Sequence, residues 1–171
     1  MISLDAVPLL KGFSSANMAA QKLAVKQILP YTDILGISLH PFVSAYKTST
    51  FPFDIFRSIR KLTNKSIAIT ETSYPAQQFT ITINGSPVLF EGSNVKQQRF
   101  YNSLLKAAKR DRYEFVLVFT FRDYDGLWNA VGRTDTLLVW RDTGLYSETG
   151  ARRSALSLWQ AYFKKRWRKK F

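Results

Sequence analysis

The 171-residue chain contains no cysteine and only one histidine, His40. The absence of cysteine excludes disulfides and thiolate metal sites, and it leaves the redox compartment open. No apolar run approaches the roughly 18 residues that a membrane span needs, and the first residues lack the positive region and apolar core of a signal peptide. A glycine-rich phosphate loop, a Cys/His zinc spacing and a Gly-x-Ser-x-Gly elbow are also missing. We therefore expect neither a cofactor nor a metal.

Acidic residues are scarce, because 12 Asp and Glu stand against 25 Lys and Arg, a formal net charge of +13. Residues 151–171 hold eight of the bases and no acid, and six of these lie in the final segment FKKRWRKKF. Such a tail suits a membrane surface or nucleic acid, although short basic ends are commonly only solvated. Nucleic acid is the weaker alternative, because aromatic residues are not interleaved with bases elsewhere. We divide the chain into one domain, 1–163, and a basic tail, 164–171.

What the sequence does contain is an alternation of helix and strand patterns. Nearly continuous apolar runs predict strands covered on both faces, at 33–42, 66–75 and 113–126. Helical spacing predicts helices at 14–31, 51–65, 93–112 and 150–167. The opening residues 1–7 are predicted to be a strand remnant. In the loop 76–94, an Asn84-Gly85 turn between apolar runs predicts a β-hairpin. The alternation indicates an α/β fold with parallel strands and right-handed helical crossovers.

Each predicted strand ends in polar or aromatic residues. The first ends at His40, the second at Glu71 and Tyr74, and the third at Asp123, a few residues before Trp128. Because the carboxyl ends of parallel strands share one side of the sheet, where active sites are built, these residues should converge there. This convergence is the main functional signal in the sequence.

A glutamate at such a position can attack an electrophilic carbon. For a sugar, that carbon is the anomeric centre, and a second carboxyl group must act as acid and base. Nearby aromatic residues such as Phe119 and Trp128 offer flat faces for a pyranose ring. Structural roles are the alternatives: a salt bridge for Glu71, a turn cap for His40, and a turn for Asp123.

Four segments in order resemble the retaining (β/α)8 glycosidases of clan A, closest to the endo-β-1,4-galactanase family. DILGISLHPF (33–42) is similar to that family's sixth strand, and SIAITETSYP (66–75) resembles the seventh, whose terminal glutamate is the nucleophile. FVLVFTFRDYDGLW (115–128) resembles the eighth strand, and DTGLYSETGARRSALSLW (142–159) resembles the closing segment. The resemblance implies a catalytic nucleophile, Glu71, and substrate-binding positions at His40, Tyr74, Phe119, Asp123 and Trp128, with no metal.

The chain is too short for a complete barrel, which needs about 250 residues. The resemblance places it at about strands five to eight, the C-terminal half of a TIM barrel. The family's acid/base glutamate follows strand four in an Asn-Glu pair, and no Asn-Glu occurs here. Since general acid catalysis contributes about 10²–10⁴-fold, we expect the chain alone to be a poor or inactive glycosidase. It is a fragment of a longer product, or it pairs with a separate N-terminal half-barrel or with a second copy.

Three functions follow as hypotheses. The first is glycoside hydrolysis in a completed barrel, and the second is carbohydrate binding or assembly without catalysis. The third is binding of nucleic acid or a membrane surface by the basic tail, which salt should weaken steeply for nucleic acid. The resemblance further implies a secreted or periplasmic enzyme, although the sequence itself leaves localisation open.

Overall fold

The computed structural model describes residues 1–5, 18–44 and 54–165. The described strands are β1 Ile2–Asp5, β2 Ile34–Leu39, β3 Ser66–Thr72, β4 Phe79–Ile83, β5 Ser86–Phe90 and β6 Val116–Val118. The described helices are α1 Met18–Ile28, α2 Ile55–Arg60, α3 Asn94–Asp111, α4 Asp125–Ala130, α5 Asp135–Arg141 and α6 Ser154–Phe163.

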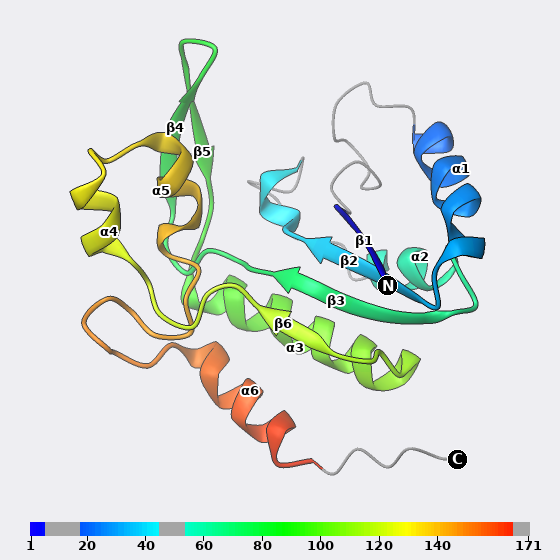
Figure 1. The fold of residues 1–171 in the computed structure, drawn as a ribbon. Helices are drawn as coiled ribbons and strands as arrows, with labels where there is room; N and C mark the ends of the chain where they lie inside the picture. The colour runs from blue at the N-terminus through cyan, green and yellow to red at the C-terminus, as the bar shows by residue number, and fades with distance from the viewer. Residues whose placement is uncertain (6–17, 45–53, 166–171) are drawn as a thin grey trace.

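The main sheet has four parallel strands in the order β1-β2-β3-β6, as the alternation of elements predicts. Helices α3 and α6 lie side by side along it (Figure 1). The strand residues that carry the core alternate along each strand, so that they share one face. The core cluster includes, from the strands, Leu35, Ile37, Ile67 and Ile69, and, from α3, Phe100 and Leu104. Burial of this face against helices is the main force that holds the sheet in place.

The intervening strand positions carry small and polar residues. The hydroxyls of Ser3 on β1 and Thr70 on β3 lie 2.6 Å apart. They meet across Gly36 of β2, where a Cβ atom would come within 2.8 Å of the Thr70 methyl group. A residue with a side chain at position 36 would therefore push β1 and β3 away from this contact.

The sheet is open, because β1 and β6 each pair with only one of the described strands. The outer strand β6 carries Leu117, which is 54% exposed, and it follows Phe115, which is 37% exposed. An unpaired strand edge with exposed apolar side chains can accept another strand. The four strands and their two free edges are compatible with half of an eight-stranded barrel.

Helix α3 ties the sheet to the loops at the carboxyl ends of its strands. The helix begins after Ser93, whose hydroxyl accepts a hydrogen bond from the Lys96 amide at 3.1 Å, a standard N-cap. One turn later, the fully buried Gln97 donates from Nε2 to the carbonyl oxygens of Tyr74 at 3.1 Å and Gly144 at 2.9 Å. One side chain thereby satisfies backbone groups from two loops that are far apart in the sequence.

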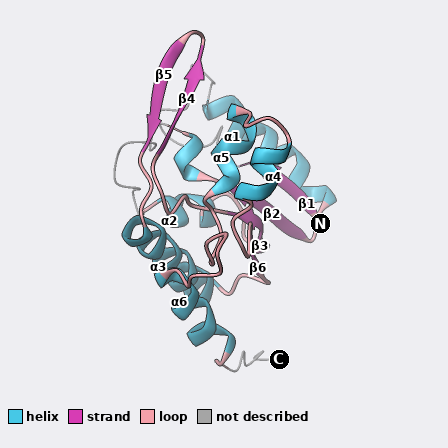
Figure 2. Ribbon diagram, turned by 90° about the vertical axis from the view of Figure 1, so that its left-hand side faces the viewer, coloured by secondary structure: helices cyan, strands magenta, loops and turns pink. Residues whose placement is uncertain are grey.

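The predicted hairpin is confirmed, with β4 and β5 antiparallel around Asn84 and Gly85. Figure 2 shows it projecting from the body of the molecule. The helix predicted at 14–31 is described only from Met18; its regular part ends at Ile28, and a 3₁₀ turn follows at Leu29–Tyr31. The starts predicted at 14 for this helix and at 51 for the next lie outside the described residues.

The third predicted strand, 113–126, is wrong in its extent. Only Val116–Val118 forms a strand, and the chain then leaves the sheet and forms α4 and α5, which the sequence patterns did not predict. The reason is that β6 lies at the sheet edge, where β3 is the only described strand with which it can form hydrogen bonds. The aromatic residues beyond it pack against other loops: Phe121 contacts Tyr146 at 5.0 Å between ring centroids.

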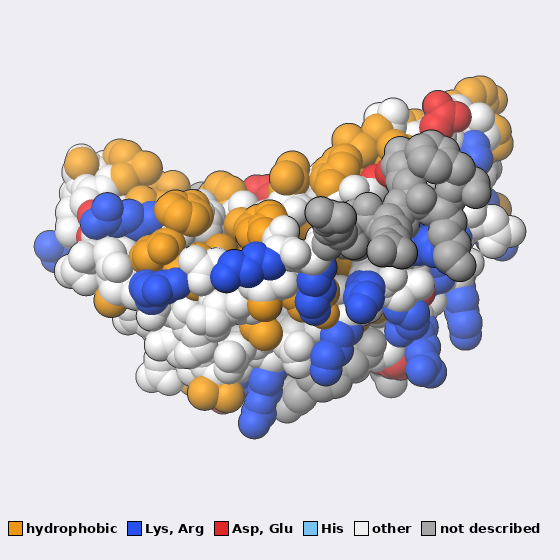
Figure 3. All heavy atoms as spheres, turned by 90° about the horizontal axis from the view of Figure 1, so that it is seen from below, with side chains coloured by type: hydrophobic (Ala, Val, Ile, Leu, Met, Phe, Trp, Pro, Cys, Tyr) orange, Lys and Arg blue, Asp and Glu red, His pale blue; other side chains and the backbone are white. Residues whose placement is uncertain are grey.

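The surface seen in Figure 3 carries Lys and Arg side chains scattered over it, with no acidic patch of similar extent. Exposed bases on α3 include Arg99, Lys106, Lys109 and Arg110. Of the predicted tail, only the first two residues are described: Lys164 and Lys165 are exposed, and Lys165 lies over the Tyr162 ring at 3.9 Å. Among the described helices, none is both long and apolar enough to cross a membrane.

Candidate active site

The carboxyl ends of three adjacent strands bring Asp5, Ser38 and Glu71 into register. Asp5 on β1 lies opposite Ser38 on β2, and Ser38 lies opposite Glu71 on β3. The second pairing depends on a register shift between Ile37 and Ser38, which moves the ladder by one residue. The Ser38 hydroxyl donates to Glu71 Oε2 at 3.5 Å, so the shift places a donor beside the carboxylate.

His40 also lies near the same carboxylate oxygen. Its Nε2 is 3.6 Å from Glu71 Oε2, and its Nδ1 is 2.7 Å from the Ser73 hydroxyl. Burial lowers the pKa of His40, and the neighbouring Glu71 carboxylate opposes that effect. A neutral imidazole that accepts from Ser73 at Nδ1 has its hydrogen on Nε2, facing Glu71. If His40 is neutral and accepts from Ser73, its Nε2 hydrogen lies on the side of the Glu71 carboxylate, at a distance longer than a hydrogen bond.

Glu71 faces a cavity of about 380 Å³. Its side chain is 45% exposed, whereas His40 behind it is buried. Besides these two, the cavity is lined by Asp5, Ser38, Val43, Phe119 and Trp140. The volume lies in the range of small-molecule sites, and the lining includes two carboxylates and two large aromatic side chains, Phe119 and Trp140.

Trp140 is a cavity residue that the sequence analysis missed. It comes from α5, and its ring contacts His40 at 4.7 Å and Phe119 at 5.8 Å between centroids, both edge to face. The Trp140 ring therefore packs against the His40 ring, whose Nδ1 contacts Ser73. The apolar run Leu137–Trp140, within a polar stretch, was the sequence signal for this short helix. A prediction of the helix would have placed Trp140 on its apolar, inward-facing side.

The structure brings Glu71, His40 and Phe119 together at one cavity, but Tyr74 and Trp128 do not line it. Tyr74 is 2% exposed and packs between Phe42, at 6.0 Å, and Phe100, at 5.3 Å. Burial raises the pKa of Tyr74 to about 12, which agrees with a hydroxyl held in the core.

Trp128 lies on α4, outside the cavity lining. The guanidinium of Arg141 stacks on its ring at 4.5 Å, and its Nε1 donates to the Thr134 carbonyl at 3.0 Å. These contacts join the short helices α4 and α5 to each other.

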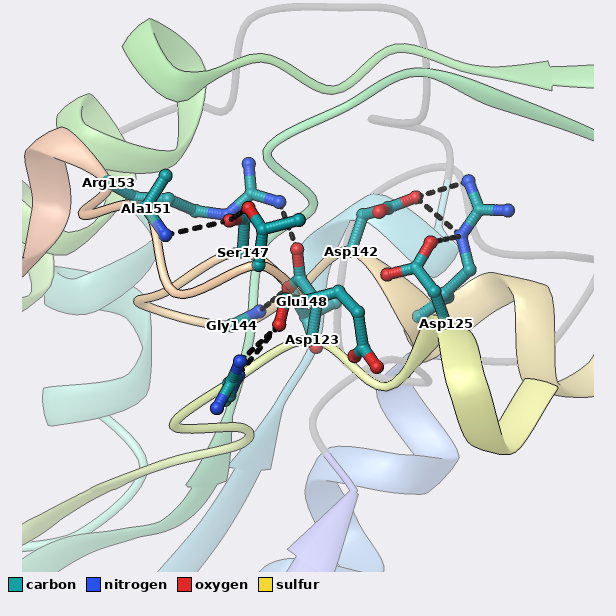
Figure 4. A network of polar contacts seen from close by, with 12 residues as sticks. Asp123, Asp125, Asp142, Gly144, Ser147, Glu148, Ala151 and Arg153 are labelled. Carbon is teal, nitrogen blue, oxygen red and sulfur yellow. Dashed lines mark hydrogen bonds and ion pairs between the residues drawn. The ribbon is translucent and has the colours of Figure 1, made fainter. Parts of the chain in front are cut away.

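Asp123 is buried at 3% exposure and forms an ion pair with Arg153, which precedes α6. Its Oδ1 also accepts from the Gly144 amide at 2.8 Å. Burial raises the pKa of Asp123, and the Arg153 guanidinium and Gly144 amide oppose that effect. Figure 4 shows Asp123 directed into a polar network beneath the loops. Asp125 and Asp142 belong to the same network, and one oxygen from each of the three aspartates lies within 4.8 Å of the others.

No family model and no curated protein matches the chain. Solved structures do match: Ruminococcus gnavus β-glucuronidase aligns with a TM-score of 0.52 and 13% identity, over 80% of this chain and 23% of that one. The same organism's enzyme in complex with a C6-substituted uronic isofagomine aligns with a TM-score of 0.55 and 11% identity, over 95% and 26%. The enzyme in complex with D-glucuronic acid aligns with a TM-score of 0.55 and 12% identity, over 84% of this chain and 25% of that one.

The fold of this chain, a parallel sheet with helices, is similar to part of the fold of these β-glucuronidases. The chain spans about a quarter of the length of the structures it matches. At this identity the likeness concerns the fold alone. It agrees with the glycosidase resemblance of the sequence segments, and it gives no specific support to the galactanase family.

Proposed function

We propose that the chain forms the nucleophile-bearing part of a retaining glycoside hydrolase, with Glu71 as the nucleophile. The observation that carries the proposal is the position of Glu71 at the end of β3. Its carboxylate is half-exposed in a cavity, the Ser38 hydroxyl donates to its Oε2 oxygen at 3.5 Å, and His40 Nε2 lies 3.6 Å from the same oxygen. Its second oxygen, Oε1, would attack the anomeric carbon of a bound sugar.

The reaction needs two carboxyl groups, a nucleophile and a proton donor, and in this proposal the chain supplies the nucleophile. As the bond between Glu71 Oε1 and the anomeric carbon forms, the bond to the leaving oxygen breaks, and that oxygen needs a proton. In a retaining enzyme the donor would be a carboxyl group about 5–5.5 Å from the nucleophile. We place this donor on a complementary half-barrel that would pair with β1 and β6, either an N-terminal half or a second copy.

The cavity favours an uncharged sugar. The β-glucuronidase neighbours include a complex with D-glucuronic acid, which carries a carboxylate. In this chain the described lining residues offer two carboxylates, Asp5 and Glu71, and no Lys or Arg. A uronate would meet charges of its own sign, whereas a neutral pyranose would use the aromatic faces of Phe119 and Trp140 and hydrogen bonds to the carboxylates.

An activated glycoside tests the proposal without the missing proton donor. A 2-deoxy-2-fluoro-β-glycoside with a dinitrophenolate leaving group should react because dinitrophenolate departs without protonation, and the fluorine slows hydrolysis of the ester formed. We expect the intact chain to gain the mass of one fluorosugar, with the label on the Glu71 peptide. Glu71→Gln should remain unlabelled, and the exposed Glu114→Gln should label like the wild type.

Labelling of Glu71→Gln at the wild-type rate would overturn the proposal. So would the absence of a label from a panel of gluco-, galacto- and glucurono-configured reagents, provided that calorimetry shows one of the corresponding sugars to bind. Binding without labelling would favour the second candidate, a carbohydrate-binding or assembly protein. The open sheet edges are the observation that favours this candidate.

A further inference from the structure

A cluster of three aspartates lies beneath the loops at the carboxyl end of the sheet, apart from the Glu71 cavity. Asp123 belongs to the segment after β6, Asp125 is the first residue of α4, and Asp142 directly follows α5. One carboxylate oxygen from each lies within 4.8 Å of the others. Figure 4 shows the three aspartate side chains in one polar network, while the nearby Glu148 carboxylate accepts from the Gly126 amide at 3.3 Å.

One oxygen of this cluster has no partner in the structure. Asp142 is 1% exposed, and its Oδ2 accepts from Arg141 at 2.7 Å and 3.0 Å, but its buried Oδ1 accepts no hydrogen bond. A buried carboxylate oxygen without a donor is costly and rare in folded proteins. A ligand that bears positive charge would satisfy it.

The local charge count agrees. Three carboxylates bring three negative charges, and the two guanidiniums that pair with them, Arg141 and Arg153, bring two positive ones, so that one negative charge is left over. Asp123 and Asp142 are both almost fully buried, which makes an uncompensated charge unfavourable there. The excess charge and the orphan oxygen therefore point to the same missing cation.

We propose that Asp123, Asp125 and Asp142 bind a divalent cation, and that this cation is Ca²⁺. All three ligands are hard carboxylate oxygens, which suit Ca²⁺, Mg²⁺ or Mn²⁺ rather than softer metals. Two oxygens bound to one Ca²⁺ ion at about 2.4 Å are at most about 4.8 Å apart, and the three carboxylate oxygens lie within that limit of one another. The shorter bonds of Mg²⁺, about 2.0–2.1 Å, require a tighter group and a strict octahedron.

The cation would join the segment after β6 to the end of α5. Asp142 lies two residues after Trp140, which walls the Glu71 cavity, and the Asp142 carbonyl accepts from the Ala76 amide at 2.8 Å in the loop after β3. The site therefore holds three loops of the cavity rim at one point. Its role is structural, and the proposal does not depend on the catalytic role of Glu71.

Terbium luminescence tests the site directly, because Tb³⁺ replaces Ca²⁺ and the nearby Trp128 and Trp140 can sensitise its emission. The full chain, first stripped with a chelator, should gain tryptophan-sensitised emission that Ca²⁺ competes away, and Ca²⁺ should raise its melting temperature. Asp125→Asn and Asp142→Asn should each weaken Tb³⁺ and Ca²⁺ binding at least tenfold. Asp33→Asn, an exposed aspartate before β2 at the opposite end of the sheet, is the matched control and should bind like the wild type.

Asp125→Asn keeps the test decisive if Asp142→Asn fails to fold, because Asp125 is only half-buried. Wild-type emission and melting temperature that do not respond to Tb³⁺, Ca²⁺ or Mn²⁺ would overturn the proposal. Equal binding by Asp125→Asn and the wild type would also overturn it, because the bound ion would lie elsewhere.

Discussion

Replacing Asp123 with alanine should destabilise the protein strongly, because Arg153 would lose its partner in the interior. Both side chains are at least 94% buried, and Asp123 also accepts the Gly144 amide. Breaking a buried pair by removing one partner costs about 3–5 kcal/mol, mostly because the other charge stays buried. With a urea m-value of about 2 kcal/mol per molar, the unfolding midpoint should fall by roughly 2 M.

A double-mutant cycle identifies the cause of that loss. Asp123→Ala, Arg153→Met and the double variant should be unfolded in urea in the presence of a chelator, so that cation binding does not contribute. If the two residues acted independently, the double variant would lose the sum of the two single losses. We expect it to lose no more than the worse single variant, since neither charge is then left alone.

The partly exposed pair Glu91–Lys96 is the control, and Glu91→Ala should cost less than about 1 kcal/mol. A loss below about 1 kcal/mol for Asp123→Ala, or strict additivity in the cycle, would refute the reasoning. Either result would mean that Asp123 and Arg153 do not form a buried pair in solution.

Two further predictions concern the sheet and the histidine. Gly36→Ala should lower the free energy of unfolding by about 1–3 kcal/mol, because its Cβ would lie 2.8 Å from Thr70 and 3.0 Å from the Ile2 carbonyl; a urea midpoint equal to that of the wild type would contradict this packing. Because burial lowers the pKa of His40 below its ordinary value of 6.5, the unfolded chain binds that proton first as the pH falls. The folded state should therefore lose stability below about pH 6.5. Between pH 7 and pH 5, the free energy of unfolding should fall less for His40→Gln than for the wild type. Equal falls for the two proteins in urea unfolding would show that His40 is not the group responsible.

The sequence was sufficient for the elements whose signals are local. The apolar runs of β2 and β3, the Asn84-Gly85 turn and the amphipathic α3 depend on neighbours within a few residues. The meeting of His40 and Glu71 followed from a general rule, because the ends of adjacent parallel strands share one rim. The catalytic and binding roles given to these residues stay predictions.

The rest depended on contacts that no local pattern records. The register that brings Asp5 to the Glu71 cavity results from pairing across more than thirty residues, and Arg153 finds Asp123 from thirty residues away. Tyr74 follows Glu71 closely, yet the chain has left β3 by then and turns this ring into the core. Trp140 lies on a short helix whose position is set by packing against the hairpin strand β4.

The two free edges of the sheet also limit how copies of this chain could associate. Strand β6 of one molecule and β1 of the next would form a head-to-tail contact between unlike surfaces, not a self-complementary one. Repetition of such a contact gives a closed ring when the rotation per step divides the circle, and an endless filament when it does not. Twist and stagger at β1 and β6 thus decide between a finite assembly and a growing fibre.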